Sequence, residues 1–181
     1  MIVFFGPAGA GKSTQGQILS VTYGWPLFSA GQLLRDMHDN NLLETMRTGK
    51  LVPPEKVNQL MGDALSQNSG ASNVILDGFP RQLVQAHWLI DNQHSYGRSI
   101  DLVIVLDIPK PELMRRLEAR GRVDDIPEVI SERLKIYYQE ISSILDLFTR
   151  LGIKIIHIDG SRQKDEVNKE IMKEIMKCKL V

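Results

Sequence analysis

The chain has 181 residues, a hydrophobic fraction of 43%, and 22 basic against 22 acidic side chains, so its formal net charge is zero. This length and composition suit one globular domain with one sizeable core. The balanced charge gives no sign of nucleic acid or a membrane as a partner, so any anion recognition must be local. The single cysteine, Cys178, excludes an internal disulfide and a four-cysteine zinc site.

The chain opens with an apolar run, residues 1–5, which we interpret as a buried strand. A glycine-rich segment from Gly6 to Thr14 follows and fits the pattern G-x-x-x-x-G-K-S/T, and a helical stretch comes next. Strand, glycine loop and helix form the setting in which this motif binds phosphate, through backbone N–H groups and the helix N-terminus. Lys12 can reach the β- and γ-phosphates of ATP, and the Ser13 hydroxyl can hold Mg²⁺. The motif leaves no room before it for a targeting peptide, so we expect a cytoplasmic protein.

Four further strands are predicted at residues 26–29, 73–76, 102–106 and 154–158. Three of the five strands are near-continuous aliphatic runs, which indicates a parallel sheet covered by helices on both faces. The predicted helices separate the strands and lie at 30–40, 42–48, 54–67, 81–91, 109–120, 127–149 and 164–178. Alternating strands and helices predict βαβ units with right-handed crossovers.

Ligands of open parallel sheets bind at the carboxyl ends of the strands, so we considered which residues follow each strand. Ser29, a plausible helix N-cap, and Arg35 follow the second strand, and Asp77-Gly78-Phe79-Pro80-Arg81 follows the third. An acid that ends an apolar strand is suited to hold Mg²⁺ or its waters opposite Ser13. Asp107 also ends a strand, but no arginine follows it, so we prefer Asp77.

Further arginines follow the fourth strand and the helix after it. Arg120 and Arg122 are separated by one glycine, and Arg133 lies in the next helix. Each arginine alone has an ordinary structural explanation, such as a solvated loop or a capped helix. Together with Lys12, Arg35 and Arg81 they carry far more positive charge than one nucleotide requires. Planar guanidinium groups bind phosphate in a bidentate manner, so the set predicts phosphoryl transfer between two phosphate-bearing molecules.

These motifs resemble the nucleoside monophosphate kinases, and in particular the adenylate kinase family, nearly from end to end. The matching segments are the glycine loop, Ser29 to Arg35, Gly49 to Pro53, Asp77 to Arg81 with Gln85, Gly121 to Asp125, Arg133, and Asp159-Gly160. The resemblance implies a P-loop NTPase fold: a three-layer α/β/α domain, residues 1–181, with a five-stranded parallel sheet. Within it we expect a core (1–28, 69–119 and 127–181), a monophosphate-binding flap (about 29–68) and a short lid (about 120–126).

The resemblance also implies roles for individual residues. The expected catalytic residues are Lys12, Arg81, Arg120, Arg122 and Arg133. ATP would be bound by Gly9, Ala10, Gly11, Lys12, Ser13, Thr14, Arg120 and Arg162. The monophosphate would be bound by Ala30, Arg35, Lys50, Leu51, Val52, Gly78, Phe79, Pro80, Arg81, Gln85, Arg122 and Arg133. Ser13 and Asp77 would hold Mg²⁺, partly through water, and the short lid implies no zinc. We expect a monomer that binds ATP and AMP, or another nucleoside monophosphate.

Two positions depart from the adenylate kinase pattern. Ala30 and Gln32 stand where adenylate kinases typically have Thr and Asp, and the sequence around these two positions resembles that of UMP/CMP kinases. Gln85 matches adenylate kinases instead, and its amide can both donate to and accept from an adenine edge. We expect AMP as the acceptor, with CMP, UMP or a broader set as the alternative. A nucleotide-binding regulator without turnover is a more remote alternative.

Overall fold

The computed structural model describes residues 1–122 and 124–181, so Val123 of the predicted lid lies outside the described residues. Its sheet has five strands in the order β2-β3-β1-β4-β5. All neighbouring strands run parallel, and the register places Phe4 opposite both Asp77 and Ile104. The strands are β1 (Ile2–Phe5), β2 (Leu27–Ser29), β3 (Ile75–Asp77), β4 (Leu102–Asp107) and β5 (Ile155–Asp159). The predicted parallel sheet is confirmed.

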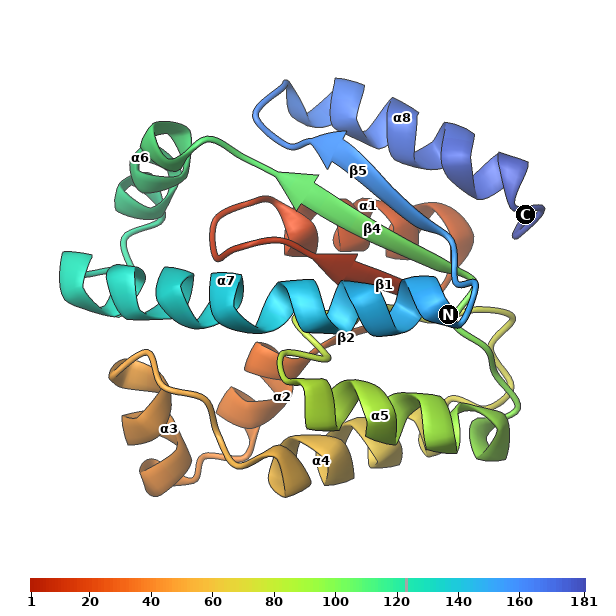
Figure 1. Cartoon of the computed structure of the whole chain (residues 1–181), viewed down its shortest axis with the longest axis horizontal. Helices are drawn as coiled ribbons and strands as arrows, with labels where there is room; N and C mark the ends of the chain where they lie inside the picture. The colour runs from red at the N-terminus through yellow and green to blue at the C-terminus, as the bar shows by residue number, and fades with distance from the viewer. Residues whose placement is uncertain (123) are drawn as a thin grey trace.

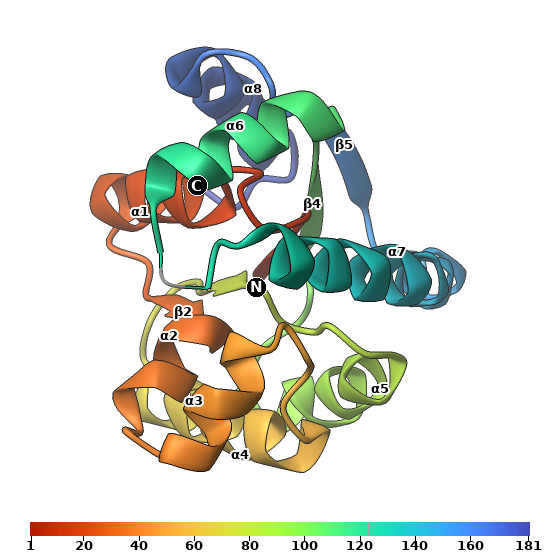
Figure 2. The same ribbon diagram turned by 90° about the vertical axis from the view of Figure 1, so that its left-hand side faces the viewer.

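Helices cover both faces of this sheet, as Figures 1 and 2 show. On one face lie α5 (Leu83–Asn92) and α7 (Pro127–Arg150), and on the other lie α1 (Lys12–Tyr23) and α8 (Lys164–Lys177). The remaining helices are α2 (Ala30–Asp36), α3 (Asn40–Arg47), α4 (Pro54–Gln67), α6 (Lys110–Arg120) and the short 3₁₀ helix η1 (Gln93–Tyr96). No helix in the described parts of the chain is both long and apolar enough to cross a membrane.

Two hydrophobic clusters lie on opposite faces of the sheet. Val3 and Phe5 of β1 pack in the cluster that contains Phe148 of α7. Ile2 and Phe4 pack in the second cluster, with Leu19 of α1. Successive side chains of a strand point to opposite faces, so a strand covered on both sides must be apolar at every position. This explains why the strands read as unbroken aliphatic runs.

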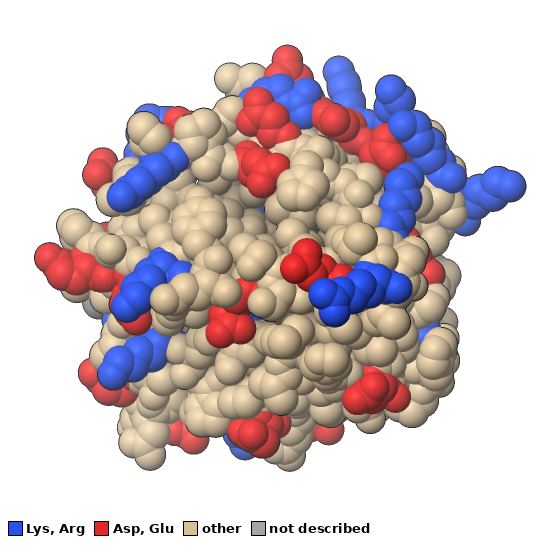
Figure 3. Space-filling model, viewed as in Figure 1, with Lys and Arg blue, Asp and Glu red and all other residues tan. Residues whose placement is uncertain are grey.

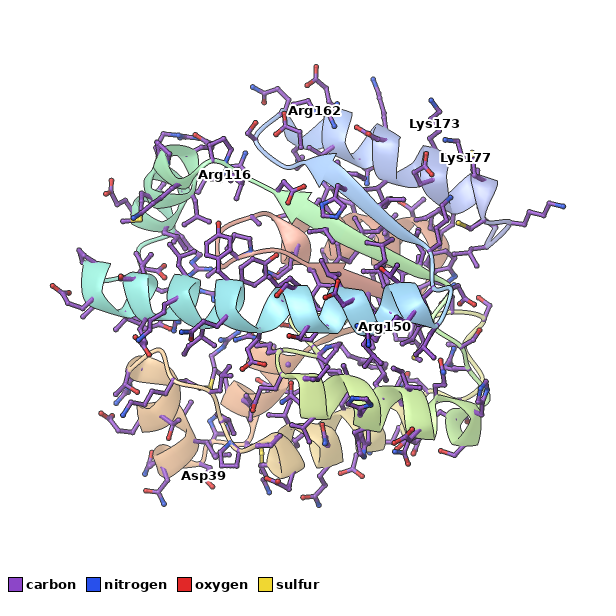
Figure 4. All side chains as sticks on the ribbon, viewed as in Figure 1. Asp39, Arg116, Arg150, Arg162, Lys173 and Lys177 are labelled. Carbon is purple, nitrogen blue, oxygen red and sulfur yellow. The ribbon has the colours of Figure 1, made fainter. Side chains whose placement is uncertain are left out.

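The structure corrects the predicted helix at 30–40. Helix α2 ends at Asp36, and His38 has a left-handed backbone with φ of 53°. The carboxylate of Asp39 then accepts hydrogen bonds from the N–H groups of Asn41 and Leu42, at 2.9 and 3.2 Å, and so caps α3 (Figure 4). Ser29 occupies the N-cap position of α2, but its side chain makes no capping hydrogen bond.

The helix predicted from Arg81 begins only at Leu83. The Arg81 N–H donates to the side-chain oxygen of Gln85 at 2.7 Å. This hydrogen bond joins the turn after Gly78 to the first turn of α5, so the helix starts after Arg81.

The stability of the two-sided packing can be tested on α7. Phe148 is fully buried and its ring centroid lies 6.1 Å from that of Phe5. Phe148→Ala should lower the free energy of unfolding by about 3–5 kcal/mol, because it leaves a cavity between helix and sheet. Urea denaturation of the wild type and of Gln139→Ala, an exposed position on the same helix, provides the comparison. A loss for Phe148→Ala no larger than that of the control would contradict the packing described here.

Candidate active site

A cavity of about 500 Å³ lies at the carboxyl edge of the sheet. Figure 2 looks onto this edge, with α6 on one side of the glycine loop and α2 and α3 on the other. The walls include most of the residues predicted from the sequence. These are Gly9, Ala10, Gly11, Lys12, Ser13, Thr14, Arg35, Lys50, Asp77, Arg81, Arg120, Arg122, Arg133 and Arg162.

This concentration of positive charge is local. On the face shown in Figure 3 acidic and basic side chains are interspersed, and the densest group of basic side chains lies over α8, where Figure 4 labels Lys173 and Lys177. The cavity at the carboxyl edge lies apart from that group. On this face the basic side chains gather over α8, and the cavity walls carry a separate set of arginines and lysines.

The glycine loop needs glycine at its tightest points. Gly6 has φ of +143°, and a Cβ there would lie 2.9 Å from the carbonyl oxygen of Leu106. Gly9 has φ of +89°, and a Cβ there would lie 3.0 Å from Leu117. Both positions combine a backbone conformation that favours glycine with close neighbours. The loop can therefore wrap tightly between β1 and the start of α1.

Lys12 folds back over this loop. Its ammonium donates to the carbonyl oxygens of Gly6 at 2.7 Å and Pro7 at 2.9 Å. Burial lowers the pKa of Lys12 to about 8. Asp77 opposes that shift, and the positive charges of Arg81 and Arg120 add to it. The negative charge of an incoming phosphate would stabilise the protonated form of Lys12.

Ser13 and Asp77 lie together beside Lys12. The Ser13 hydroxyl donates to the Asp77 carboxylate, and Asp77 is only 3% exposed at the end of β3. Asp107, the alternative acid, instead pairs with Nδ1 of His157 at 2.8 Å and is absent from the cavity wall. The hydroxyl and carboxylate oxygens at the glycine loop are the hard ligands that Mg²⁺ prefers.

Arg35 and Arg81 meet over Gly31. A Cβ at Gly31 would lie 3.5 Å from Nη1 of Arg35 and 4.0 Å from Nη2 of Arg81. Nε of Arg81 donates to the carbonyl of Gly78 at 2.8 Å, and this hydrogen bond fixes the direction of the side chain. Gly78 has φ of +68°, a backbone conformation that favours glycine, and a Cβ there would lie 2.8 Å from the same guanidinium. Two guanidinium groups are thus presented side by side to one part of the cavity.

Arg120 and Arg133 are paired with the carboxylates of the segment between α6 and α7. Nε of Arg120 donates to Asp125 at 2.8 Å, and Arg133 forms an ion pair with Asp124. Partial burial would raise the pKa of Asp124, but the hydrogen bond and charge of Arg133 outweigh it and hold the pKa below its ordinary value. Arg133 also donates to the carbonyl of Met46 at 3.1 Å, which links α7 to the end of α3.

Several predicted monophosphate contacts lie outside this cavity. Ala30, Val52, Phe79 and Gln85 are each at most 4% exposed and pack beside it. Leu51, Gly78 and Pro80 instead line an adjoining cavity of about 90 Å³, which shares Lys12, Arg81 and Arg133 with the larger one. The structure thus brings the charged members of the predicted set together, whereas the apolar members form the surrounding packing.

The sequence analysis missed Arg116. Its Nε donates to Glu112 at 2.7 Å and its Nη2 to the carbonyl of Ser161 at 3.2 Å. It lines the cavity between α6 and the turn before α8, on the same side as Arg162 (Figure 4). Residues four apart on a helix lie on one face, so the spacing of Arg116 and Arg120 was a usable signal.

The family model for adenylate kinase matches residues 4–153. The chain belongs to the adenylate kinase family. It is 44% identical over 153 residues to an adenylate kinase of Mycolicibacterium paratuberculosis, covering 81% of this chain and 84% of the relative. It is 38% identical over 172 residues to an adenylate kinase of Mycobacterium ulcerans, covering 92% and 93%. It is also 36% identical over 176 residues to adenylate kinase 1 of Nostoc, covering 94% and 95%.

The lowered pKa of Lys12 predicts how this member of the family responds to pH. Below about pH 8 the ammonium is charged in the empty site, and above it the free protein loses this proton. Binding of ATP, which favours the charged form, should then weaken by up to about tenfold per pH unit. Calorimetric titration with ATP and Mg²⁺ from pH 7 to 9.5, without an acceptor, measures this.

Lys12→Arg provides the control for this titration, because a guanidinium stays charged throughout the range. Its dissociation constant for ATP should not change with pH, whatever its absolute value. A wild-type profile as flat as that of the variant would contradict the assignment of the pKa near 8.

Proposed function

We propose that this chain transfers the terminal phosphoryl group of ATP to AMP and forms two molecules of ADP. The single observation that carries the proposal is the convergence of Lys12 and the arginines at 35, 81, 120, 122 and 133 on one cavity at the glycine loop. Binding of a single nucleoside triphosphate does not require so many guanidinium groups. Membership of the adenylate kinase family supports the same reaction.

In this reaction the nucleophile is a phosphate oxygen of AMP, which is already ionised. No general base is needed, so catalysis consists of positioning and of neutralising charge on the transferring group. We assign Arg35 and Arg81 to the AMP phosphate, because they meet over Gly31. We assign Lys12, Arg120 and Arg122 to the transferring group, with Arg133 beside them. The lid over residues 120–126 would exclude water, which otherwise hydrolyses ATP.

Ser13 and Asp77 fit Mg²⁺, because a hydroxyl and a carboxylate lie against each other at the glycine loop. We propose that they hold the ion, Asp77 partly through water. When bound there, Mg²⁺ would supply positive charge that offsets the charge of the phosphates. Lys12 and the arginines would orient the same phosphates. We further propose that the flap, lid and core divide as the sequence predicts, and that the enzyme acts as a cytoplasmic monomer.

AMP is the acceptor that we favour. The similarity to adenylate kinases supports AMP. Ala30 supports the alternative, a kinase for CMP, UMP or a wider set, because it has no hydroxyl with which to contact a base. A missing hydrogen bond of this kind is worth about 1 kcal/mol, which loosens base selection without reversing it.

Arg81→Ala should lower turnover by about 10²-fold, because it removes a guanidinium that positions the phosphate of AMP for attack. Its fold should persist, as judged by circular dichroism. The matched control is Arg150→Ala, an exposed arginine at the last turn of α7 (Figure 4), which should leave turnover unchanged. Near-normal turnover of Arg81→Ala in a coupled ADP assay would remove Arg81 from the site.

Competition among AMP, dAMP, CMP and UMP, each at equal concentration with ATP, tests the choice of acceptor. We expect AMP to have the highest kcat/KM, with CMP and UMP lower by tenfold or more. A preference for CMP or UMP would identify a pyrimidine kinase. ATP hydrolysis that does not depend on any monophosphate would indicate an ATPase, and binding without turnover would indicate a regulator.

A further inference from the structure

The side chain of Gln32 lies between Arg35 and Asp36 on α2. Nη2 of Arg35 donates to Oε1 of Gln32 at 3.0 Å, and Nε2 of Gln32 donates to the carboxylate of Asp36 at 2.6 Å. A guanidinium can only donate and a carboxylate can only accept, so the orientation of the Gln32 amide is fixed by its two neighbours. The three side chains form a directed chain from the cavity wall to solvent.

Arg35 needs such an anchor because its surroundings repel it. Burial and the positive charge of Arg122 lower its pKa, whereas Asp124 and Asp36 act in the opposite direction. Arg81 lies on its other side, across Gly31. Without a phosphate in the cavity, a long side chain among like charges favours rotamers that point to solvent. A fixed acceptor on its own helix holds it at the cavity wall.

We propose that Gln32 is a positioning residue, which holds Arg35 in place for the phosphate of the monophosphate substrate. The inference rests on the proposed function and extends it to a residue that does not line the cavity. Gln32 accepts from Arg35 through its side-chain oxygen, and the carboxylate of Asp36 holds the nitrogen of the same amide. The acceptor for Arg35 is therefore held in place by a second hydrogen bond.

The consequence is a specific kinetic signature. Gln32→Met keeps the length and helix preference of the side chain but removes the strong acceptor. It should raise KM for AMP about fivefold, the factor that one hydrogen bond corresponds to. Because Arg35 makes its contact in both the bound and the reacting state, kcat at saturating AMP should change little. KM for ATP should also stay unchanged.

Gln32→Glu provides the matched variant, because it retains an oxygen that accepts from Arg35. Its KM for AMP should stay within about twofold of the wild type. Gln32 is exposed, so both variants should fold normally. A KM for AMP that is unchanged in Gln32→Met, or raised equally in Gln32→Met and Gln32→Glu, would overturn the proposal.

A double-mutant cycle with Arg35→Lys decides whether Gln32 acts through Arg35. We expect Gln32→Met to have no further effect on KM for AMP in the Arg35→Lys background, because the guanidinium that it positions is gone. Independent, multiplicative effects would overturn the proposal. The wild type is measured first in the coupled assay. Absence of AMP-dependent ADP formation there would refute the proposed function itself, whereas an active wild type with an indifferent Gln32 would refute only the positioning role.

Discussion

The arrangement around the cavity is governed by mutual repulsion among the lysines and arginines that line it, which outnumber the acids beside them. The structure balances this repulsion in small local steps. Carbonyl oxygens of the glycine loop accept from Lys12, the carbonyl of Gly78 holds Arg81, and the carboxylates of Asp125 and Asp124 pair with Arg120 and Arg133. Each of these partners satisfies donors of one cation, so several positive charges can line one cavity.

Parallel strands bring these groups together. Because every strand runs in the same direction, the residues that follow β1, β2 and β3 all reach one edge of the sheet. The register sets Ser29 beside Asp77 and Asp77 beside Phe4, so the loop after each strand begins at a similar level. Burial of both sheet faces makes this edge rigid, and the loops can then differ in chemistry without loss of position.

The parts of this structure that follow local rules were predictable from the sequence, and the parts that depend on long-range contacts were not. Short apolar segments, three of them near-continuous aliphatic runs, predicted the strands, and strand direction predicted that the arginines would converge. The end of α2 before His38 was missed because no glycine or proline marks it. An aspartate such as Asp39, which caps α3, is too weak a signal on its own to place a helix boundary. Gln85 was expected at the substrate, but its oxygen is bound by the backbone of Arg81, a contact that exists only once the turn has formed.

Arg133 connects two segments that border the cavity. It contacts Asp124, just before α7, and the carbonyl of Met46 in α3, so one side chain of α7 touches both segments. Gly49 packs so closely against α7 that a Cβ there would lie 3.0 Å from the carbonyl of Val129. A guanidinium has five N–H donors, so Arg133 can hold both Asp124 and Met46 and still have a donor left at the cavity that it lines. One side chain of α7 therefore ties two separate segments to the same wall of the cavity.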